Sequence, residues 1–275
     1  MVLGAVVLGY AVTSILLLKF PRLLHRKKTL KFFPTHISHR GGAGENIENT
    51  MTAFHHALEV GTEMLEIDCH LTRDGHVIVS HDSSLKRSCE CEGQVADFDY
   101  KDLPLLKERH KLDFQQSFTY DGTGCPDRRF PLLREVFQAF PSIPINIDIK
   151  IDDDELIEKV NQLIVEFNRE EITAWGNRSA IVVDKLHRIN PNVPLIFSYK
   201  KVLLLLVYFY TGLLPFISLE ESLLEVVMPG AVLKYRYWLW DNDAVETYLW
   251  VLNEDDEFER AFKLGAHGVM TDFPY

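Results

Sequence analysis

Residues 37–82 read ISHRGGAGENIENTMTAFHHALEVGTEMLEIDCHLTRDGHVIVSHD, and this stretch decides the fold. Short β-branched runs lie at residues 36–40, 64–69 and 77–81. Between the first two runs, apolar residues recur at helical spacing, Asn49 or Thr50 can cap the start of a helix, and Gly61 can end it. A strand followed by a helix and a second strand predicts a parallel α/β fold.

The same alternation continues to the end of the chain. Further runs at residues 145–149, 172–175, 195–198, 248–252 and 268–271 bring the expected strands to eight. Amphipathic helical patterns lie between them in PLLREVFQAFP, DELIEKVNQLIVEFN and EDDEFERAFKLG. Eight strands with intervening helices predict a (β/α)8 barrel, whose active site lies at the C-terminal ends of the strands.

Composition agrees with one large folded domain. The chain has 275 residues, of which 47% are hydrophobic and 25% are charged, so it can bury a full core. The net charge of −11 argues against duplex nucleic acid as a partner. Four cysteines in a chain of this length predict neither a disulfide framework nor a zinc site, and we expect reduced thiols at Cys69, Cys89, Cys91 and Cys125.

The N-terminus is apolar and then basic. Residues 1–18 carry no charge, and Lys19, Arg22, Arg26, Lys27 and Lys28 follow. Such a run is just long enough to cross a hydrocarbon core. Because the basic residues come after it, a signal anchor is favoured over a cleaved signal peptide, with a buried N-terminal helix as the alternative. We expect a transmembrane helix at residues 1–18, a basic linker at residues 19–34 and a cytoplasmic catalytic barrel at residues 35–275.

A second apolar run, VLLLLVYFYTGLLPFI, occupies residues 202–217. Gly212 and Pro215 interrupt any helix near its end. A membrane crossing here would separate motifs that belong to one expected site. We therefore expect an apolar loop that contacts the membrane surface, with a buried helix as the alternative.

Three segments depart from a regular barrel. Residues 87–131 are long and polar, and they predict a surface insertion able to cap the site. The segment between Pro229 and Trp250 is short for a strand–helix crossover. Tyr275 follows the last expected strand directly, so we expect a barrel that is incomplete at its C-terminus or closed by the N-terminal segment.

Acidic residues at two strand ends indicate a metal site. Glu66 and Asp68 are two residues apart on a strand, so their side chains share one face. Two adjacent carboxylates repel each other unless one is protonated or a cation neutralises them. Asp148 ends a further expected strand and can supply a third oxygen. Oxygen ligands suit a hard cation, which predicts Mg²⁺ or Ca²⁺.

Basic residues at the strand ends indicate phosphate chemistry. His39 and His81 each end an expected strand, and a pair of imidazoles beside a metal fits general acid and general base. Arg40 and Lys150 can bind an anionic group such as a phosphate. Together these side chains predict phosphodiester cleavage rather than sugar or acyl chemistry. Further polar residues follow the last two expected strands, at Asn253 and Asp272.

These residues resemble a known family. The motifs HRG, ENT, ExD, VSHD, INIDIK, LWVLNE and GVMTDFP, in this order, resemble the glycerophosphodiester phosphodiesterase family over residues 36–275. The N-terminal anchor and the HISHRGGAGENIENT segment are most similar to its membrane-bound mammalian subgroup, which is associated with lysophospholipase D activity.

The resemblance implies a (β/α)8 barrel with a divalent metal, and a role for each matching residue. Glu66, Asp68 and Asp148 match the metal ligands, His39 and His81 the acid/base pair, Arg40 and Lys150 the phosphate contacts, Trp250 the substrate contact, and Glu48 a supporting acid. Two positions depart from the family pattern. Asp148 stands where the family usually has glutamate, and Ile47 stands where it usually has proline.

The apolar runs refine the expected substrate. A single-chain lipid resides in the membrane, so we expect hydrolysis of lysophosphatidylcholine, lysophosphatidylethanolamine and N-acyl lysophosphatidylethanolamine to lysophosphatidic acid and the head group. The expected location is the endoplasmic reticulum or perinuclear cytoplasm. The alternatives are a phosphodiesterase of water-soluble substrates, a non-catalytic lipid-binding protein with a decayed barrel, and a phosphoinositide-cleaving phospholipase C.

Overall fold

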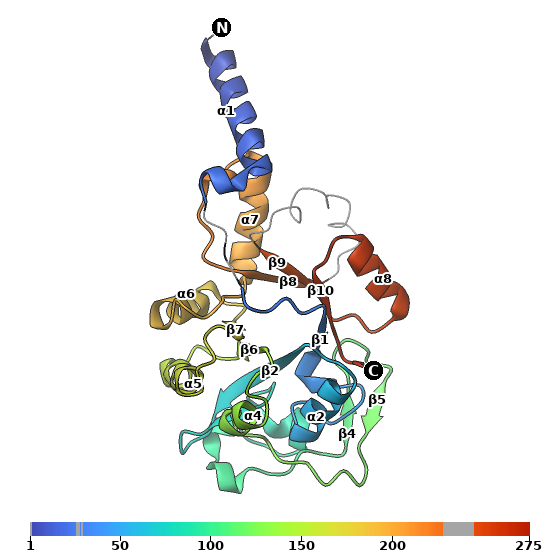
Figure 1. The fold of residues 1–275 in the computed structure, drawn as a ribbon. Coiled ribbons are helices and arrows are strands. Elements are labelled where there is room, and N and C mark those ends of the chain that lie inside the picture. Colours follow the sequence, from blue (N-terminus) through green and yellow to red (C-terminus); the bar gives the residue numbers. More distant parts are fainter. Residues whose placement is uncertain (1, 26–27, 29, 228–244) are drawn as a thin grey trace.

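The structure, a computed structural model, describes residues 2–25, 28, 30–227 and 245–275. Its helices are α1 Val2–Lys19, α2 Met51–Glu59, α3 Leu85–Cys89, α4 Leu133–Ala139, α5 Asp154–Glu166, α6 Ala180–Ile189, α7 Tyr199–Thr211 and α8 Asp255–Lys263 (Figure 1). Its strands are β1 His36–Ser38, β2 Met64–Leu71, β3 Val77–Val79, β4 Arg109–Lys111, β5 Thr119–Asp121, β6 Ile145–Ile149, β7 Thr173–Gly176, β8 Leu223–Val227, β9 Glu246–Trp250 and β10 Gly268–Thr271.

The main sheet is a parallel barrel, as predicted. Its strands pair in the order β7-β6-β2-β1-β10-β9-β8. Single parallel bridges join the two ends of this path: Trp175 pairs with Leu195, and Ile196 pairs with Leu223. The segment at 195–196 therefore takes one of the eight places. β10 pairs with β9 on one side and with the N-terminal strand β1 on the other, which agrees with the second of the two expected arrangements, closure by the N-terminal segment.

One predicted barrel strand was wrong. The run at residues 77–81 forms β3, which pairs antiparallel with the end of β2 as a hairpin beyond the barrel. A parallel pairing was impossible, because only five residues separate β2 from β3 and a parallel crossover needs a dozen or more. The vacant place belongs to β8, which was not among the eight predicted strands. The predicted short crossover after Pro229 lies outside the described residues.

The interior of the barrel changes character along its axis. Alternate residues of each strand point inward. In the layer nearer the N-terminal ends these residues are apolar. They form one buried cluster with Phe32, namely Ile37, Met64, Leu223, Tyr248 and Met270. Further along β2 and β6 the inward residues are Glu66, Asp68, Asn146 and Asp148. The apolar layer therefore supports a polar layer at the C-terminal end.

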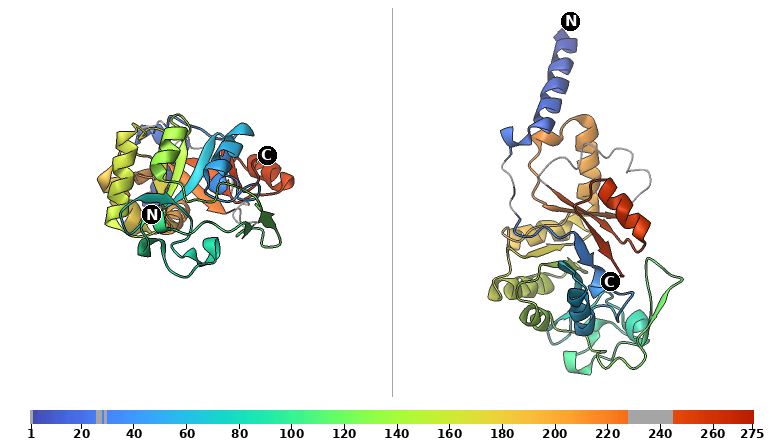
Figure 2. Two further views of the ribbon diagram at one scale, coloured as in Figure 1. Left: turned by 90° about the horizontal axis from the view of Figure 1, so that it is seen from below. Right: turned by 45° about the vertical axis from the view of Figure 1, so that its right-hand side comes forward.

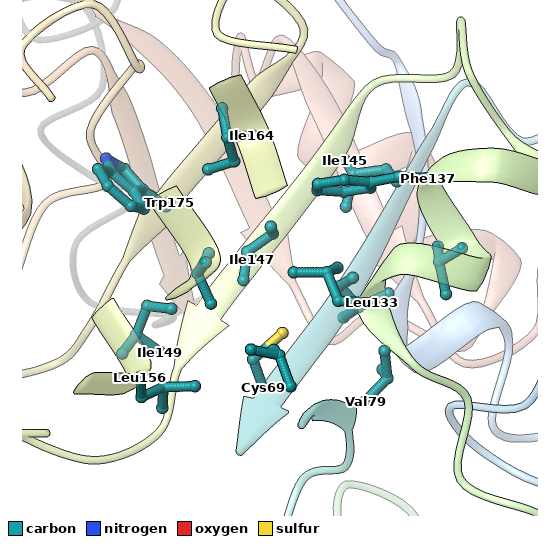
Figure 3. Packing of buried hydrophobic residues seen from close by; sticks show 14 of the residues in the cluster. Cys69, Val79, Leu133, Phe137, Ile145, Ile147, Ile149, Leu156, Ile164 and Trp175 are labelled. Atoms are coloured by element: carbon teal, nitrogen blue, oxygen red, sulfur yellow. The ribbon is translucent and has the colours of Figure 1, made fainter. Parts of the chain in front are cut away.

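The largest core lies outside the barrel wall. Outward residues of β2, β6 and β7, such as Cys69, Ile147 and Trp175, pack under α4 and α5 (Figure 3). This burial holds β2 and β6, the two strands that carry the carboxylates, in fixed positions.

The predicted helix boundaries hold where capping residues are present. The Thr50 side chain accepts a hydrogen bond of 3.2 Å from Ala53 N–H at the start of α2. Gly61, just beyond α2, and Gly265, just beyond α8, have φ angles of 100° and 89°.

The two apolar runs are both helical. α1 is long and apolar enough to cross a membrane, and it projects away from the barrel (Figures 1 and 2). Residues 202–217 form most of α7 and a short 3-10 turn, Leu214–Phe216, rather than the loop we expected. The reason is that Ser198 caps the run and no breaker occurs before Gly212, whose φ angle of 74° ends the helix. α7 is half exposed, so the buried-helix alternative does not hold either.

Candidate active site

A pocket of about 380 Å³ opens at the C-terminal ends of the barrel strands. Most residues predicted from the sequence line it, namely His39, Arg40, Glu66, His81, Asp148, Lys150 and Trp250. The others lie behind its wall, bonded to the lining or to one another, namely Glu48, Asp68, Asn253 and Asp272.

A tight turn after β1 places His39 and Arg40 in the pocket wall. Arg40 and Gly41 have positive φ angles of 52° and 77°. Glycine adopts this conformation without strain. A Cβ at Gly41 would lie 2.6 Å from the ring of Phe54, so only glycine lets α2 pack against the turn.

An aspartate directly after the last strand holds His39. The Nδ1 atom of His39 lies 2.6 Å from Oδ1 of Asp272, and both side chains are buried. Asn253 in turn donates from Nδ2 to Oδ2 of Asp272 at 3.1 Å. The aspartate thus fixes the ring orientation and directs Nε2 away from itself.

His81 reaches the pocket from the β2–β3 hairpin rather than from a barrel strand. The backbone N–H of Ser80 donates to the carbonyl of Asp68 at 2.9 Å, which ties the returning chain to β2. His81 therefore arrives at the pocket although its strand runs opposite to the others.

A second aspartate holds His81. The Nδ1 atom of His81 lies 2.6 Å from Oδ1 of Asp82. Arg87 donates to the other oxygen of Asp82 and, at 2.6 Å, to Glu48. Sequence reasoning missed Asp82 and Arg87. The signal was available, because an aspartate directly after a histidine in VSHD can orient its ring.

The carboxylates gather around Lys150. Asp68 and Asp148 are register partners on β2 and β6, and Glu66 precedes Asp68 on the same face. The Nζ atom of Lys150 lies 2.7 Å from Asp68 and 2.6 Å from Asp148. Asn49 donates to the other oxygen of Asp68 at 2.8 Å. Burial alone would raise the pKa of Asp68, but its cationic neighbours, Lys150 first, outweigh it and hold the pKa well below the usual value.

Arg40 is surrounded by acids. Its backbone N–H donates to Glu66 at 2.9 Å, and its guanidinium donates to Asp113 at 2.8 Å and Glu48 at 3.2 Å. Burial opposes its charge, but the neighbouring carboxylates, Glu48 and Asp68 first, raise its pKa above the usual value. The Arg40 guanidinium is thus a fixed positive charge at the pocket wall.

Aromatic rings form one side of the pocket. The Phe114 ring lies edge-on to Trp250 at 5.5 Å and to His39 at 5.8 Å. Phe114 and Asp113 come from the chain between β4 and β5, inside residues 87–131. This segment therefore contributes to the pocket wall, and neither residue was a sequence candidate.

Comparison with known proteins identifies the family. The glycerophosphoryl diester phosphodiesterase family profile matches residues 39–198. Lysophospholipase D GDPD1 of Rattus norvegicus is 47% identical over 97% of this chain and 92% of that protein. The chain belongs to the glycerophosphoryl diester phosphodiesterase family. Members of this family are phosphoric diester hydrolases.

Other relatives agree with this membership. Lysophospholipase D GDPD3 of Homo sapiens is 35% identical over 97% of this chain and 91% of that protein. A glycerophosphodiester phosphodiesterase crystal structure from Agrobacterium tumefaciens superposes with a TM-score of 0.66 at 19% identity, covering 87% of this chain and 96% of that chain. This likeness shows that the chain has the barrel fold of the family.

Glycerophosphoryl diester phosphodiesterases generally depend on a divalent metal, and the donors here have the chemical type that such a metal prefers. Glu66, Asp68 and Asp148 present only oxygen atoms, as Mg²⁺ and Ca²⁺ prefer. Burial, and next the charge of Asp68, raise the pKa of Glu66 well above its usual value, and a cation would relieve that repulsion. Within the described ranges, no three acidic, histidine or cysteine side chains converge on one point, and Lys150 lies between Asp68 and Asp148.

Glu225 on β8 also lines this pocket, although the sequence reasoning missed it. Asn146 donates from Nδ2 to Oε1 of Glu225 at 2.6 Å. Burial, and next the charge of Asp148, raise the pKa of Glu225 to about 8. An acid inside the apolar run LLEVV was the available signal.

Replacing Glu225 by glutamine is expected to stabilise the metal-free enzyme at alkaline pH. The unfolded carboxyl loses its proton near pH 4.5, whereas the folded one keeps it until about pH 8, so folding stability falls as pH rises through this window. Because glutamine cannot ionise, the Glu225→Gln variant should not lose folding stability in this way as pH rises. Denaturant unfolding in EDTA, compared between about pH 5.5 and about pH 8.5, should show Glu225→Gln gaining at least about 1.4 kcal/mol on the unsubstituted chain, the value of one pKa unit. The same pH dependence in both chains would refute the raised pKa of Glu225.

Proposed function

We propose that this phosphodiesterase cleaves the head group from lysophospholipids, namely lysophosphatidylcholine, lysophosphatidylethanolamine and N-acyl lysophosphatidylethanolamine, to give lysophosphatidic acid. The observation that carries the chemistry is the pair of aspartate-held histidines, His39 and His81, in one pocket with fixed cations. Among the described residues, neither Nε2 atom has a protein hydrogen bond, so each can exchange a proton with a substrate. The likeness to lysophospholipase D GDPD1 and GDPD3 supports the choice of lipid.

The first step forms a cyclic phosphate. One histidine accepts the proton of the free glycerol hydroxyl as that oxygen bonds to phosphorus. The other, protonated, histidine donates its proton to the head-group oxygen as the bond between that oxygen and phosphorus breaks. The head-group alcohol leaves with this proton.

The second step opens the ring. The histidine that gave up its proton now accepts one from water, whose oxygen bonds to phosphorus. The other histidine returns its proton to the glycerol oxygen as the ring bond breaks. Both histidines regain their starting states, and lysophosphatidic acid is the product.

The cations of the pocket serve both steps. Arg40 and Lys150 are placed to bind the phosphoryl oxygens, because both line the pocket and carry fixed positive charge. Glu66, Asp68 and Asp148 would hold a divalent metal, and Glu48 supports Arg40 and Arg87 from behind. When bound, Mg²⁺ or Ca²⁺ supplies further neutralisation of phosphoryl charge. Trp250 offers an apolar wall to the substrate.

We also infer that the enzyme is a single-pass membrane protein. α1 supports this by its length and hydropathy, and the basic residues that follow it support a cytoplasmic barrel, at the endoplasmic reticulum or perinuclear membrane. Such an anchor keeps the pocket near its lipid substrate.

The test is release of choline by the purified full-length chain in detergent. We expect faster release from lysophosphatidylcholine than from glycerophosphocholine, loss of release in EDTA, and recovery with Mg²⁺ or Ca²⁺. Faster turnover of glycerophosphocholine would favour a phosphodiesterase of water-soluble substrates. Absence of metal-dependent release from both would favour a lipid-binding protein without catalysis.

A further inference from the structure

One side of α7 is apolar and exposed along its whole length. Tyr199, Leu203, Val207 and Tyr210 are 60%, 64%, 52% and 63% exposed. Their spacing of three or four residues places them in a single row, called here the α7 stripe. The opposite side of the helix is held by Leu205, which is buried against the barrel. Contiguous exposed apolar surface of this kind indicates contact with an apolar partner.

The α7 stripe starts at the catalytic pocket. Tyr199 is its first residue and also lines the pocket, together with Phe197 and Trp250. An apolar group attached to a phosphate in the pocket can therefore leave past Tyr199 and reach the α7 stripe.

The other end of the α7 stripe lies at the membrane helix. The Tyr10 hydroxyl donates to the carbonyl of Thr211 at 2.6 Å, and Ser14 donates to the carbonyl of Gly212 at 2.7 Å. The Tyr10 ring stacks on Phe216. Figures 1 and 2 show the same arrangement, with α7 lying between the barrel and α1. The stripe thus connects the pocket with the helix that can enter a bilayer.

The length of the α7 stripe matches one acyl chain. From Tyr199 to Tyr210 the helix rises about 16 Å at 1.5 Å per residue. The hydrocarbon core of a bilayer is about 30 Å thick and holds two chains end to end, so one chain is about 15 Å long. The row is a single side chain wide, which suits a lipid with one chain.

We propose that the α7 stripe is the path of the substrate's single acyl chain, with the phosphate in the pocket and the chain lying along Leu203 and Val207 toward Tyr210. The inference rests on the proposed lysophospholipase activity and adds a specificity surface to it. The acyl chain and the α7 stripe bury each other's apolar surface, which lowers the free-energy cost of withdrawing the lipid from the bilayer.

Chain length provides the test. The substrates are octanoyl-lysophosphatidylcholine, which is a dissolved monomer, oleoyl-lysophosphatidylcholine, and glycerophosphocholine as the reference without a chain. Leu203 lies about 6 Å along the helix from Tyr199, and Tyr210 about 16 Å. For each lipid, the measured quantity is the ratio of its kcat/KM to the kcat/KM of glycerophosphocholine. Leu203→Ser should lower this ratio about tenfold for both lipids. Tyr210→Ser should lower it about tenfold for the oleoyl lipid and leave it unchanged for the octanoyl lipid.

The control variants carry matched exposed residues on other helices. Ile181 on α6 is 64% exposed, as Leu203 is, and Val165 on α5 is 47% exposed. Ile181→Ser and Val165→Ser should leave the ratio of kcat/KM to that of glycerophosphocholine unchanged for both lipids. If Leu203→Ser affects only vesicle-borne oleoyl lipid and spares the dissolved octanoyl lipid, the stripe is a membrane-docking surface and the acyl path is refuted.

A binding experiment separates this inference from the proposed function. A lysophosphatidylcholine with a diazirine at its chain end is photolysed with the full-length protein, and the labelled peptide is mapped. Label within residues 203–210 supports the path even if no lipid is hydrolysed. Label elsewhere, together with normal choline release, overturns the path while the enzymatic function stands.

Discussion

Replacement of His39 by alanine is expected to lower hydrolysis of lysophosphatidylcholine by about 10³-fold or more, because it removes one of the two proposed proton-transfer groups. The loss should be in kcat, since Arg40 and Lys150, the proposed phosphate-binding residues, remain. Choline release under substrate saturation measures it, and circular dichroism checks that the barrel is intact. A folded His39→Ala variant with activity within about tenfold of the unsubstituted enzyme would remove His39 from the mechanism.

The matched variant for His39→Ala is Asp272→Asn, which preserves the shape of the pocket. Asn253 donates to Oδ2 of Asp272, so an asparagine at this position must turn its oxygen toward Asn253 and its NH₂ toward Nδ1 of His39. The ring proton is then held on Nε2, and the atom that faces the pocket can no longer accept a proton. We expect a loss of about 10²-fold to 10⁴-fold in kcat with little change in KM. A change confined to KM would contradict a positioning role for Asp272.

Asp68→Asn is expected to cost about 3–5 kcal/mol of folding stability in addition to activity, because it breaks buried ion pairs from one side. The Asp68 side chain is 1% exposed and lies 2.7 Å from Lys150 and 3.6 Å from Arg40. Removing its charge leaves two buried cations with less compensation. Denaturant unfolding of the metal-free chain at neutral pH measures the loss.

Asp148→Asn is the control for Asp68→Asn. The two residues are register partners and share Lys150, but the Asp148 side chain is 36% exposed. Solvent screens its charge, so its replacement should cost at most about 1 kcal/mol while still weakening metal-dependent hydrolysis. Equal stability losses in both variants would show that burial does not set the energetic role of these carboxylates.

The chemistry of the site could be predicted from local sequence because strand position determines direction. Residues two apart on a strand share a face, so Glu66 and Asp68 had to meet, and parallel strands brought Asp148 beside them. Partners that act across long distances were harder to identify. The pairing of Asp113 with Arg40 spans 73 residues, and nothing in the local pattern around Asp113 indicates it.

The hairpin shows the limit of reading strands one at a time. β3 has the β-branched composition of a barrel strand, yet its short link to β2 forces antiparallel pairing. The length of the loop between β2 and β3 indicates antiparallel pairing, whereas the composition of β3 does not. Conversely, Glu225 interrupts the apolar run of β8, and this half-buried acid belongs to the pocket that the other strands form.

By itself, the sequence determined the barrel class, most of the candidate residues that line the pocket and the two apolar runs, because periodicity and residue chemistry are local properties. Only the tertiary structure decided that Asp272 holds His39 and which segment completes the barrel. It also decided that α7 connects the pocket with α1. These outcomes depend on packing between segments far apart in the chain, and no local pattern specifies that packing.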